Sequence, residues 1–462
     1  MKNLITYKTV FITALLSLSA LQATAQQKPV IFGKTLTTNK NGLVRCATNE
    51  YEAYLQAKNP NRETTEQFEQ WIAPKIAERK ARRSTDAVAD VVTIPVVVHI
   101  IHNGDAIGKG ENISDAQVLS QITVLNQDYR KMADTPGWND NPVGADMEIQ
   151  FVLAQTDPDG NLTTGIDRVN LRVTTWNSED DIEANLKPNT IWDPTKYFNI
   201  WVCSFGGSIS SLLGYSQFPS SSRLGGLDTD GGDADTDGVV IGYQYFGSKT
   251  LYAKGTYDNS ETYIYGRTAT HEIGHCFGLR HIDGDNTSCT INAKDTYKDY
   301  CPDTPAITEL HYECTSEDSC PSATGTDMIE NYMDYTPDSC MNIFTLDQKG
   351  RMLTVLQNSP RRAELLTSTV TQAPTAGLQQ NKLLNSINLY PNPVQNVLNI
   401  AVSNSQLPDS YTVYNSLGQT VTNAKVSSDA SLAINTSAYS NGVYFIKIDK
   451  GSQSKTLKFV KN

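Results

Sequence analysis

Residues 268–281 read Thr-Ala-Thr-His-Glu-Ile-Gly-His-Cys-Phe-Gly-Leu-Arg-His. On a helix, His271 and His275 are four residues apart and project from the same face. Gly278 stands where this helix should end, because glycine adopts the left-handed conformation cheaply and lets the chain turn sharply. Such a turn would return His281 toward the first two imidazoles. The stretch therefore predicts three histidine nitrogens that converge on one point.

Three converging imidazoles favour a catalytic zinc ion. Zinc binds histidine nitrogen at about 2.0–2.1 Å, and a catalytic site keeps a fourth position open for water. Glu272 is not needed as a ligand, so it is placed to take a proton from the zinc-bound water as that water attacks a carbonyl. A lone His-x-x-x-His pair would more often be structural, but here several specified positions fit one mechanism. The pattern predicts metal-assisted hydrolysis.

Patterns earlier in the chain predict the fold around this helix. Residues 91–101 form a β-branched run typical of a buried strand. Ser114 or Asp115 can cap a helix over 116–129. Further strands are expected at 147–154, 199–203 and 238–243. The order indicates an α+β domain: a mixed twisted sheet, a backing helix and a zinc-binding active-site helix.

The pattern His-Glu-x-x-His-x-x-Gly-x-x-His resembles the metzincin metallopeptidases. Other motifs narrow the resemblance to the pappalysin, or cytophagalysin, family: Asp303-Thr-Pro305, Asn331-Tyr-Met-Asp-Tyr335, and a Cys-Met-x-x-Phe-Thr-x-x-Gln-x-x-Arg-Met run that ends at Met352. The similarity covers roughly residues 92–366. It implies a zinc metalloendopeptidase whose catalytic domain spans these residues.

The resemblance also assigns roles to single residues. Met333 would form an apolar floor beneath the three imidazoles. Tyr335 would donate its hydroxyl to the oxyanion of the tetrahedral intermediate, where a lost donor costs about 2.7–4 kcal/mol. Asp299 and Thr304 match positions that bind a structural calcium ion in similar enzymes. Arg-directed relatives have aspartate directly before the next cysteine, whereas Ser339 stands here and Asp338 is one residue earlier, which leaves the preferred substrate side chain open.

Cysteine usage fits an exported protein. Six of the eight cysteines lie between Cys276 and Cys340, which favours disulfides over a second metal site. The resemblance implies the pairs Cys289 with Cys320 and Cys314 with Cys340. Three other cysteines remain in the catalytic domain, Cys203, Cys276 and Cys301, and the last two could form a third bridge.

The N-terminal part of the chain predicts a removable leader and a pro-segment. Residues 1–25 combine Lys2 and Lys8, a short apolar run and the small-residue site Ala23-Thr-Ala25, as in a signal peptide. Residues 26–91 are expected to be a pro-segment, largely polar and helix-favouring. Its basic stretch 79–84 offers an exposed site for activating cleavage, unless it is only a solvated helix end.

Cys46 is the only cysteine of the pro-segment. Its thiolate could occupy the open fourth zinc position and hold the enzyme latent. The alternative is an unremarkable thiol. Because a thiolate is a good zinc ligand, we expect Cys46 to be a zinc ligand in the zymogen.

Residues 367–385 read as a polar linker, and residues 386–462 as a small all-β sandwich. This last part resembles the C-terminal sorting domain of the type IX secretion system of Bacteroidetes, through Tyr390-Pro-Asn-Pro393, Asn441-Gly-Val-Tyr444 and the closing run 455–461. The resemblance implies outer-membrane secretion machinery as a partner, and a secreted or cell-surface protein of a Gram-negative, Bacteroidetes-like bacterium. The alternative is a carbohydrate-binding or adhesive sandwich.

Composition limits the possible partners. The net charge of −12 argues against nucleic acid and anionic membranes, and no segment after the leader is apolar enough to span a bilayer. We expect a secreted zinc endopeptidase that is made as a latent zymogen and acts on proteins or peptides. The alternatives are an adhesin or binding protein with a structural zinc site, and a zinc amidase that acts on small molecules.

Overall fold

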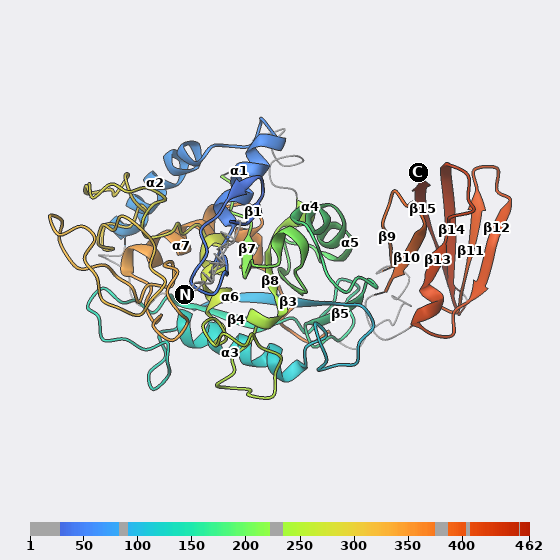
Figure 1. Cartoon of the computed structure of the whole chain (residues 1–462), viewed down its shortest axis with the longest axis horizontal. Coiled ribbons are helices and arrows are strands. Elements are labelled where there is room, and N and C mark those ends of the chain that lie inside the picture. Colours follow the sequence, from blue (N-terminus) through green and yellow to red (C-terminus); the bar gives the residue numbers. More distant parts are fainter. Residues whose placement is uncertain (1–27, 83–90, 222–233, 375–386, 403–406, 452) are drawn as a thin grey trace, which may run out of the picture.

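The computed structural model describes residues 28–82, 91–221, 234–374, 387–402, 407–451 and 453–462. The predicted signal peptide and the end of the basic stretch at Arg83 and Ser84 lie outside these ranges. In Figure 1 an N-terminal segment lies over a larger α/β body, and a β domain follows at the C-terminal end.

The α/β body is built on a six-stranded sheet of order β4-β3-β6-β8-β7, with β5 beside β3. The strands are β3 (Val92–His102), β4 (Ile149–Leu153), β5 (Ile166–Asn170), β6 (Phe198–Cys203), β7 (Gly214–Ser216) and β8 (Val239–Gly242). All pairs are parallel except β7 with β8. The mixed sheet predicted from the sequence is confirmed, although β5 and β7 were not foreseen.

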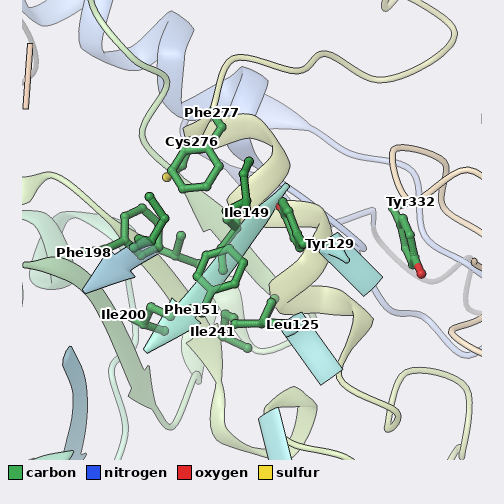
Figure 2. Packing of buried hydrophobic residues seen from close by; sticks show 14 of the residues in the cluster. Leu125, Tyr129, Ile149, Phe151, Phe198, Ile200, Ile241, Cys276, Phe277 and Tyr332 are labelled. Carbon is green, nitrogen blue, oxygen red and sulfur yellow. The ribbon is translucent and has the colours of Figure 1, made fainter. Parts of the chain in front are cut away.

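Two helices pack on one face of this sheet. They are α3 (Asp115–Tyr129), whose N-cap Ser114 accepts a hydrogen bond from the Gln117 amide, and α6 (Arg267–Cys276). Alternate residues of β3 enter the core that they cover, because successive side chains of a strand point to opposite faces. Figure 2 shows Phe151, Phe198 and Phe277 meeting in this core. The core fixes α6 against the sheet.

Further helices and turns complete the body. They are α4 (Glu179–Asp181), the π-helical turn η1 (Ile182–Leu186), α5 (Lys187–Thr190), α7 (Leu346–Asn358), α8 (Arg362–Leu365), and the 3-10 turns η2 (Gly207–Ile209), η3 (Ala234–Thr236) and η4 (Tyr243–Tyr245). Thr345 and Gln348 form a capping box that starts α7.

The N-terminal segment contains β1 (Val30–Ile31), β2 (Lys34–Thr35), α1 (Thr48–Lys58) and α2 (Thr65–Arg82). It has little core of its own and docks on the α/β body. On α2, Phe68 and Ile72 pack with Val355 of α7. Glu69 is buried and pairs with Arg351, at 2.7 Å from Oε2 to Nη1. Because a buried carboxylate needs such a partner, this contact holds α2 at one position on α7.

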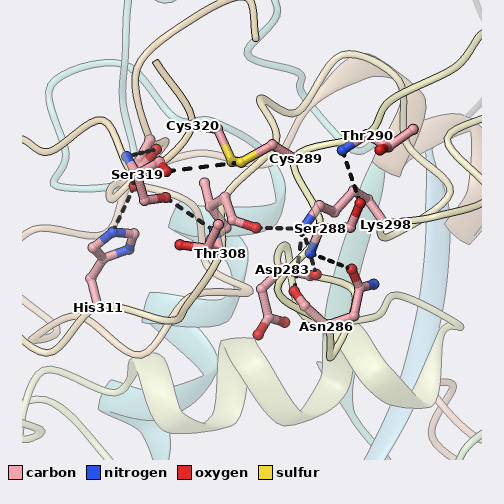
Figure 3. The surroundings of a disulfide bond; sticks show 12 residues. Asp283, Asn286, Ser288, Cys289, Thr290, Lys298, Thr308, His311, Ser319 and Cys320 are labelled. Atoms are coloured by element: carbon pink, nitrogen blue, oxygen red, sulfur yellow. Dashed lines mark hydrogen bonds and ion pairs between the residues drawn. A yellow bond between two sulfur atoms is a disulfide. The ribbon is translucent and has the colours of Figure 1, made fainter. Parts of the chain in front are cut away.

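Two disulfides cross-link the long loop between α6 and α7. Cys289 is bonded to Cys320 and Cys314 to Cys340, the pairs that the resemblance implies. Figure 3 shows the first bond among loop residues that surround Lys298. The Lys298 ammonium donates to the carbonyl oxygens of Asp283 (3.2 Å), Asn286 (3.3 Å) and Ile307.

The third bridge suggested for Cys276 and Cys301 is wrong, because both are free, buried thiols, as is Cys203. Cys276 ends α6 within the sheet-facing core, where its sulfur lies 3.7 Å from the Gly238 carbonyl oxygen. Burial raises its pKa to about 12. Cys301 is enclosed by the loop, so the two thiols belong to separate packing environments.

The C-terminal domain has two antiparallel sheets, ordered β13-β10-β9 and β12-β11-β14-β15. Its strands are β9 (Asn388–Tyr390), β10 (Val397–Ala401), β11 (Ser410–Asn415), β12 (Thr420–Lys425), β13 (Ala433–Asn435), β14 (Gly442–Lys450) and β15 (Gln453–Lys461), with the 3-10 turn η5 (Asp429–Leu432). Ile400 and Val413, from different sheets, meet in one apolar core. The predicted all-β fold is confirmed.

Val370, in the predicted linker, packs with Val97 and Trp192 of the α/β body. The Gln155 amide donates to its carbonyl oxygen at 2.7 Å. The packed body therefore extends beyond residue 366. Among the described residues, no helix combines the length and apolarity needed to cross a membrane.

Candidate active site

The three motif histidines meet at the end of α6. His271 and His275 lie on its last turns, and the helix is followed by Gly278 at φ +90°. A β-carbon at Gly278 would lie 2.7 Å from Val355, so glycine is required both by the backbone angle and by the space. The chain turns there and brings back His281. The Nε2 atom of His275 lies 3.1 Å from the Nε2 atoms of both other histidines.

Hydrogen bonds at the far nitrogens orient these rings. Nδ1 of His271 lies 2.7 Å from the Tyr332 carbonyl oxygen, and Nδ1 of His275 lies 2.8 Å from that of Leu279. A carbonyl oxygen only accepts, so each Nδ1 carries the proton and each Nε2 presents a lone pair. Burial lowers the pKa of both imidazoles well below the usual range. Neutral rings with converging lone pairs are what a metal ligand set requires.

The third ring is oriented by a carboxylate. Nδ1 of His281 lies 3.0 Å from Asp285, and this hydrogen bond raises the pKa of His281 against the effect of burial. Tetrahedral coordination at about 2.0–2.1 Å would place two ligand nitrogens roughly 3.3–3.4 Å apart, close to the observed separations. Three buried lone pairs at such distances repel each other unless a cation lies between them. The residues therefore fit a zinc ion.

Cys46 of the N-terminal segment reaches the same centre. Its sulfur and the three histidine nitrogens all lie within 4.8 Å of one another. The Thr48 amide donates to that sulfur at 3.3 Å. Backbone hydrogen bonds hold the approach, since the Val44 amide donates to Ser211 at 2.8 Å and the Leu213 amide donates to Val44 at 2.9 Å. The N-terminal segment thus crosses the centre directly.

Glu272 lies beside the centre and is fully buried. One of its oxygens, Oε2, accepts a hydrogen bond from the Thr48 hydroxyl at 2.8 Å and lies 3.5 Å from the Cys46 sulfur. The other, Oε1, has no partner among the described residues. Burial raises the pKa of Glu272 to about 7. The Glu272 carboxylate therefore lies beside the three histidines, and its hydrogen-bond partners, Thr48 and Cys46, belong to the N-terminal segment.

The segment Asn331–Tyr335 passes beneath the histidines. Met333 is fully buried, and a β-carbon at Gly274 would lie 2.5 Å from its sulfur, so glycine in α6 permits the close approach. The Tyr335 hydroxyl lies 3.2 Å from Nε2 of His281. Burial raises the pKa of Tyr335 well above its usual range, so the phenol remains a hydrogen-bond donor.

Sequence reasoning did not identify His311, which braces this segment. Its Nδ1 lies 2.7 Å from Asp334 and its Nε2 lies 2.9 Å from Asp327. These two carboxylates outweigh burial and raise the pKa of His311 to about 9. Asp334 also accepts from the Tyr335 amide at 2.7 Å. No local motif marks His311, because its partners lie 16 and 23 residues further along the chain.

Sequence reasoning also missed Arg45, whose side chain is fully buried beside the centre. Nη1 lies 3.2 Å from Asp338 and 2.7 Å from the Thr268 hydroxyl. The guanidinium carbon lies 4.5 Å from the centre of the Tyr263 ring. Asp338 also accepts from the Tyr265 amide at 3.0 Å. The position that departs from the family pattern, Ser339, is exposed, whereas the acid one residue earlier lines a pocket that holds a basic side chain.

A second group of acids lies in the cross-linked loop. Asp295 and Asp299 are both buried, and neither oxygen of Asp295 nor Oδ2 of Asp299 has a hydrogen-bond partner among the described residues. Thr304 donates to the other oxygen of Asp299 at 2.9 Å. Burial and the neighbouring Asp295 raise the pKa of Asp299 well above its usual range.

Comparison with known proteins agrees with this geometry. The sequence model of the pregnancy-associated plasma protein-A peptidase family matches residues 180–357, and that of the secretion system C-terminal sorting domain matches residues 388–462. An extracellular metalloprotease of Sordaria macrospora is 30% identical over 282 residues, which cover 61% of this chain and 80% of that protein. The chain belongs to the pregnancy-associated plasma protein-A peptidase family.

This peptidase is also similar to solved structures. Mirolysin in complex with a small compound is 36% identical, with a TM-score of 0.50, and the match covers 63% of this chain and all (100%) of that one. A mutant of Tannerella forsythia promirolysin is 32% identical, with a TM-score of 0.54, and the match covers 71% of this chain and 99% of that one. The chain is therefore a secreted zinc metalloendopeptidase that is made as a zymogen and carries a C-terminal sorting domain.

Proposed function

We propose that this peptidase cleaves peptide bonds that precede arginine or lysine, with Glu272 as the proton carrier. The observation that carries the proposal is the buried guanidinium of Arg45 between Asp338 and the Tyr263 ring, next to the three histidines. A pocket that satisfies one cationic side chain in the zymogen is available to a substrate side chain after activation. A buried, unpaired Asp338 would otherwise be unfavourable.

The residues divide the chemistry between them. His271, His275 and His281 would hold zinc, which when bound polarises the scissile carbonyl and makes water a stronger nucleophile. Glu272 would take a proton from the attacking water at a carboxylate oxygen and deliver it to the leaving amine nitrogen. Tyr335 would donate its hydroxyl to the former carbonyl oxygen as negative charge develops there. His311 supports that role because it fixes Asp334, the neighbour of Tyr335.

Latency would depend on three consecutive contacts of the N-terminal segment. Cys46 would be the fourth zinc ligand, Thr48 would occupy the carboxylate of Glu272, and Arg45 would fill the pocket at Asp338. A tethered thiolate has a much higher effective concentration than a free thiol. We assign residues 1–25 to a signal peptide, 26–91 to the pro-segment, 92–366 to the core of the peptidase, 367–385 to a linker and 386–462 to the sorting domain.

Asp299 and Thr304 would bind a structural calcium ion together with Asp295. Two buried carboxylates that leave three oxygens without donors among the described residues repel each other, and hard oxygen ligands suit calcium. The ion would stabilise the loop that carries both disulfides and His311. The sorting domain supports export by a Bacteroidetes-like, Gram-negative bacterium, and the net charge of −12 supports protein substrates over nucleic acid.

Replacing the proposed base tests the chemistry. Glu272→Ala should lower kcat/KM of the processed enzyme by about 10²–10⁴-fold, because positioned proton transfer is lost, while zinc content stays near that of wild type. Peptide cleavage and metal analysis measure the two effects. Glu330→Ala, which removes an exposed carboxylate near Met333, is the control and should keep full activity. Near-normal activity of zinc-loaded Glu272→Ala would contradict the mechanism.

Replacing the pro-segment thiol tests latency. Cys46→Ala in the full-length precursor should raise activity before cleavage by roughly tenfold or more over the wild-type precursor, because the tethered ligand is removed. Activity of the processed enzyme should not change. Cys203→Ala, which alters a thiol buried in β6, should leave the precursor latent. A Cys46→Ala precursor as latent as wild type would exclude the thiol as the main block.

Substrate profiling tests the pocket. A peptide library cleaved by the processed enzyme should show arginine or lysine directly after the scissile bond in most products. Asp338→Asn should reduce the preference for arginine over leucine by about tenfold, as expected for one lost charged contact of about 1.5–3 kcal/mol. Ser339→Ala, an exposed neighbour, should leave the profile unchanged. A profile without basic residues at this position would remove the specificity proposal.

Calcium removal tests the acidic site. Adding calcium to the calcium-free processed enzyme should raise its Tm, because an ion that binds only the folded state stabilises that state. Asp299→Ala should abolish this calcium-dependent shift, whereas Asp318→Asn, an exposed acid of the same loop, should retain it. An equal Tm of the wild type with and without calcium would refute the calcium site.

A further inference from the structure

Tyr51 of α1 is fully buried between Phe32 of its own segment and a group of peptidase residues. The Tyr51 ring centre lies 5.2 Å from that of Tyr215, in a T-shaped arrangement. The Lys187 ammonium lies 4.8 Å from the centre of the Tyr51 ring. The Tyr51 hydroxyl donates to Oε2 of Glu183 and lies 3.5 Å from Oε1 of Gln217. We call Glu183, Lys187, Tyr215 and Gln217 the phenol seat.

The seat is assembled without the N-terminal segment. Oε1 of Glu183 accepts a hydrogen bond from Tyr215 at 2.6 Å and pairs with Lys187 at 2.6 Å. The second oxygen, Oε2, is therefore the one directed at Tyr51. Lys187 is fully buried, and its ion pair fixes the position of the Glu183 carboxylate. Release of the pro-segment would expose an aromatic wall with a carboxylate oxygen at its base.

The path of the pro-segment relates the seat to the reaction centre. The segment follows the edge strand β7, from Val44 beside Leu212 to Thr48, whose hydroxyl accepts from the Ser216 amide at 2.9 Å. The arginine pocket lies near the start of this path. The phenol seat lies at its end, and the three histidines lie between. The seat is therefore on the side of the substrate residues that precede the scissile bond.

Strand geometry narrows the position further. A β-carbon at Gly214 would lie 3.4 Å from Glu272, so Gly214 faces α6 and the next residue, Tyr215, faces the opposite side. The side chains of an extended substrate beside β7 alternate between these two faces. The residue after the bond points toward Thr268 of α6, so the first and third residues before the bond point toward Tyr215. At about 3.3 Å per residue, the third reaches the end of β7.

We infer that the phenol seat is a substrate subsite that takes a tyrosine side chain at the third residue before the scissile bond. The inference rests on the proposed endopeptidase function and extends it to a second specificity site. Phenylalanine fits the same aromatic wall but leaves the oxygen of Glu183 without its donor. Since an unsatisfied buried acceptor is costly, the seat distinguishes tyrosine from phenylalanine. In the zymogen Tyr51 occupies it.

The test uses wild-type processed enzyme and peptides that differ in one residue. All peptides carry arginine after the scissile bond, and the third residue before it is tyrosine, phenylalanine or leucine. We expect kcat/KM for tyrosine to exceed that for phenylalanine by roughly tenfold. In a matched series, tyrosine and phenylalanine are exchanged at the second residue before the scissile bond, and kcat/KM should be equal for the two peptides. Equal rates for tyrosine and phenylalanine at the third position overturn the subsite, whereas no cleavage of any peptide overturns the proposed function instead.

A variant pair identifies the acceptor. Glu183→Gln should reduce the ratio of kcat/KM for tyrosine over phenylalanine to less than half of its wild-type value, because an amide is a weaker acceptor than a carboxylate. Asp181→Asn changes the charge at an exposed position two residues away and should keep the wild-type ratio. An unchanged ratio in Glu183→Gln overturns the assignment of the seat. Should that variant fail to fold, the wild-type peptide comparison still decides.

Discussion

The structure depends on holding Nε2 of His275 at 3.1 Å from Nε2 of both His271 and His281 in a buried site. Their lone pairs repel one another, and burial removes the water that would otherwise screen them. Each ring is therefore fixed from behind, two by backbone carbonyls and His281 by Asp285. The two carbonyls belong to different turns of the chain, so the metal centre exists only when α6, the turn at Gly278 and the segment before Met333 are all in place.

The need of buried polar groups for partners also explains how the N-terminal segment fits. Without this segment, the metal site, the Glu272 carboxylate, the pocket at Asp338 and the phenol seat would each lack a partner. The segment supplies one matching group for each, namely a thiol, a hydroxyl, a guanidinium and a phenol, within a few residues of one another. Buried polar groups must find partners, and the segment supplies a complementary group to each of these positions. Its helix α2 adds a separate anchor through Glu69 and Arg351.

The loop between α6 and α7 links stability to catalysis. It carries both disulfides, the unpaired acids Asp295 and Asp299, and His311. The protonated His311 joins two carboxylates, one of which binds the amide of Tyr335. A change in the loop is therefore transmitted to the residue beside the histidines through two hydrogen bonds. A secreted enzyme whose loop lacks a large core gains rigidity in this way from disulfides and buried ion pairs.

The sequence by itself indicated the proposed metal ligands, the proposed base and the helix that presents them, because these residues lie on one helix and on the turn that follows it. It also predicted the mixed sheet, the backing helix and the β-sandwich, since buried strands and amphipathic helices leave periodic patterns. It failed for β7, which is short and carries no alternating pattern, although the N-terminal segment runs beside this strand. It also failed for the suggested bond between Cys276 and Cys301, because cysteine spacing carries no information about which core each thiol enters.

Only the tertiary structure decided what surrounds the centre. Arg45 and Asp338 are almost three hundred residues apart in sequence and His311 pairs with acids on another segment, so no local pattern could connect them. The family motif has aspartate at the position of Ser339, which is exposed here. The buried acid that pairs with Arg45 is Asp338, one residue earlier. Tyr51 and Glu183 are also far apart in the sequence, 132 residues, and only the packing of the fold brings them together. A short-range pattern encodes the residues that one helix can align, and long-range packing selects the partners that buried charges require.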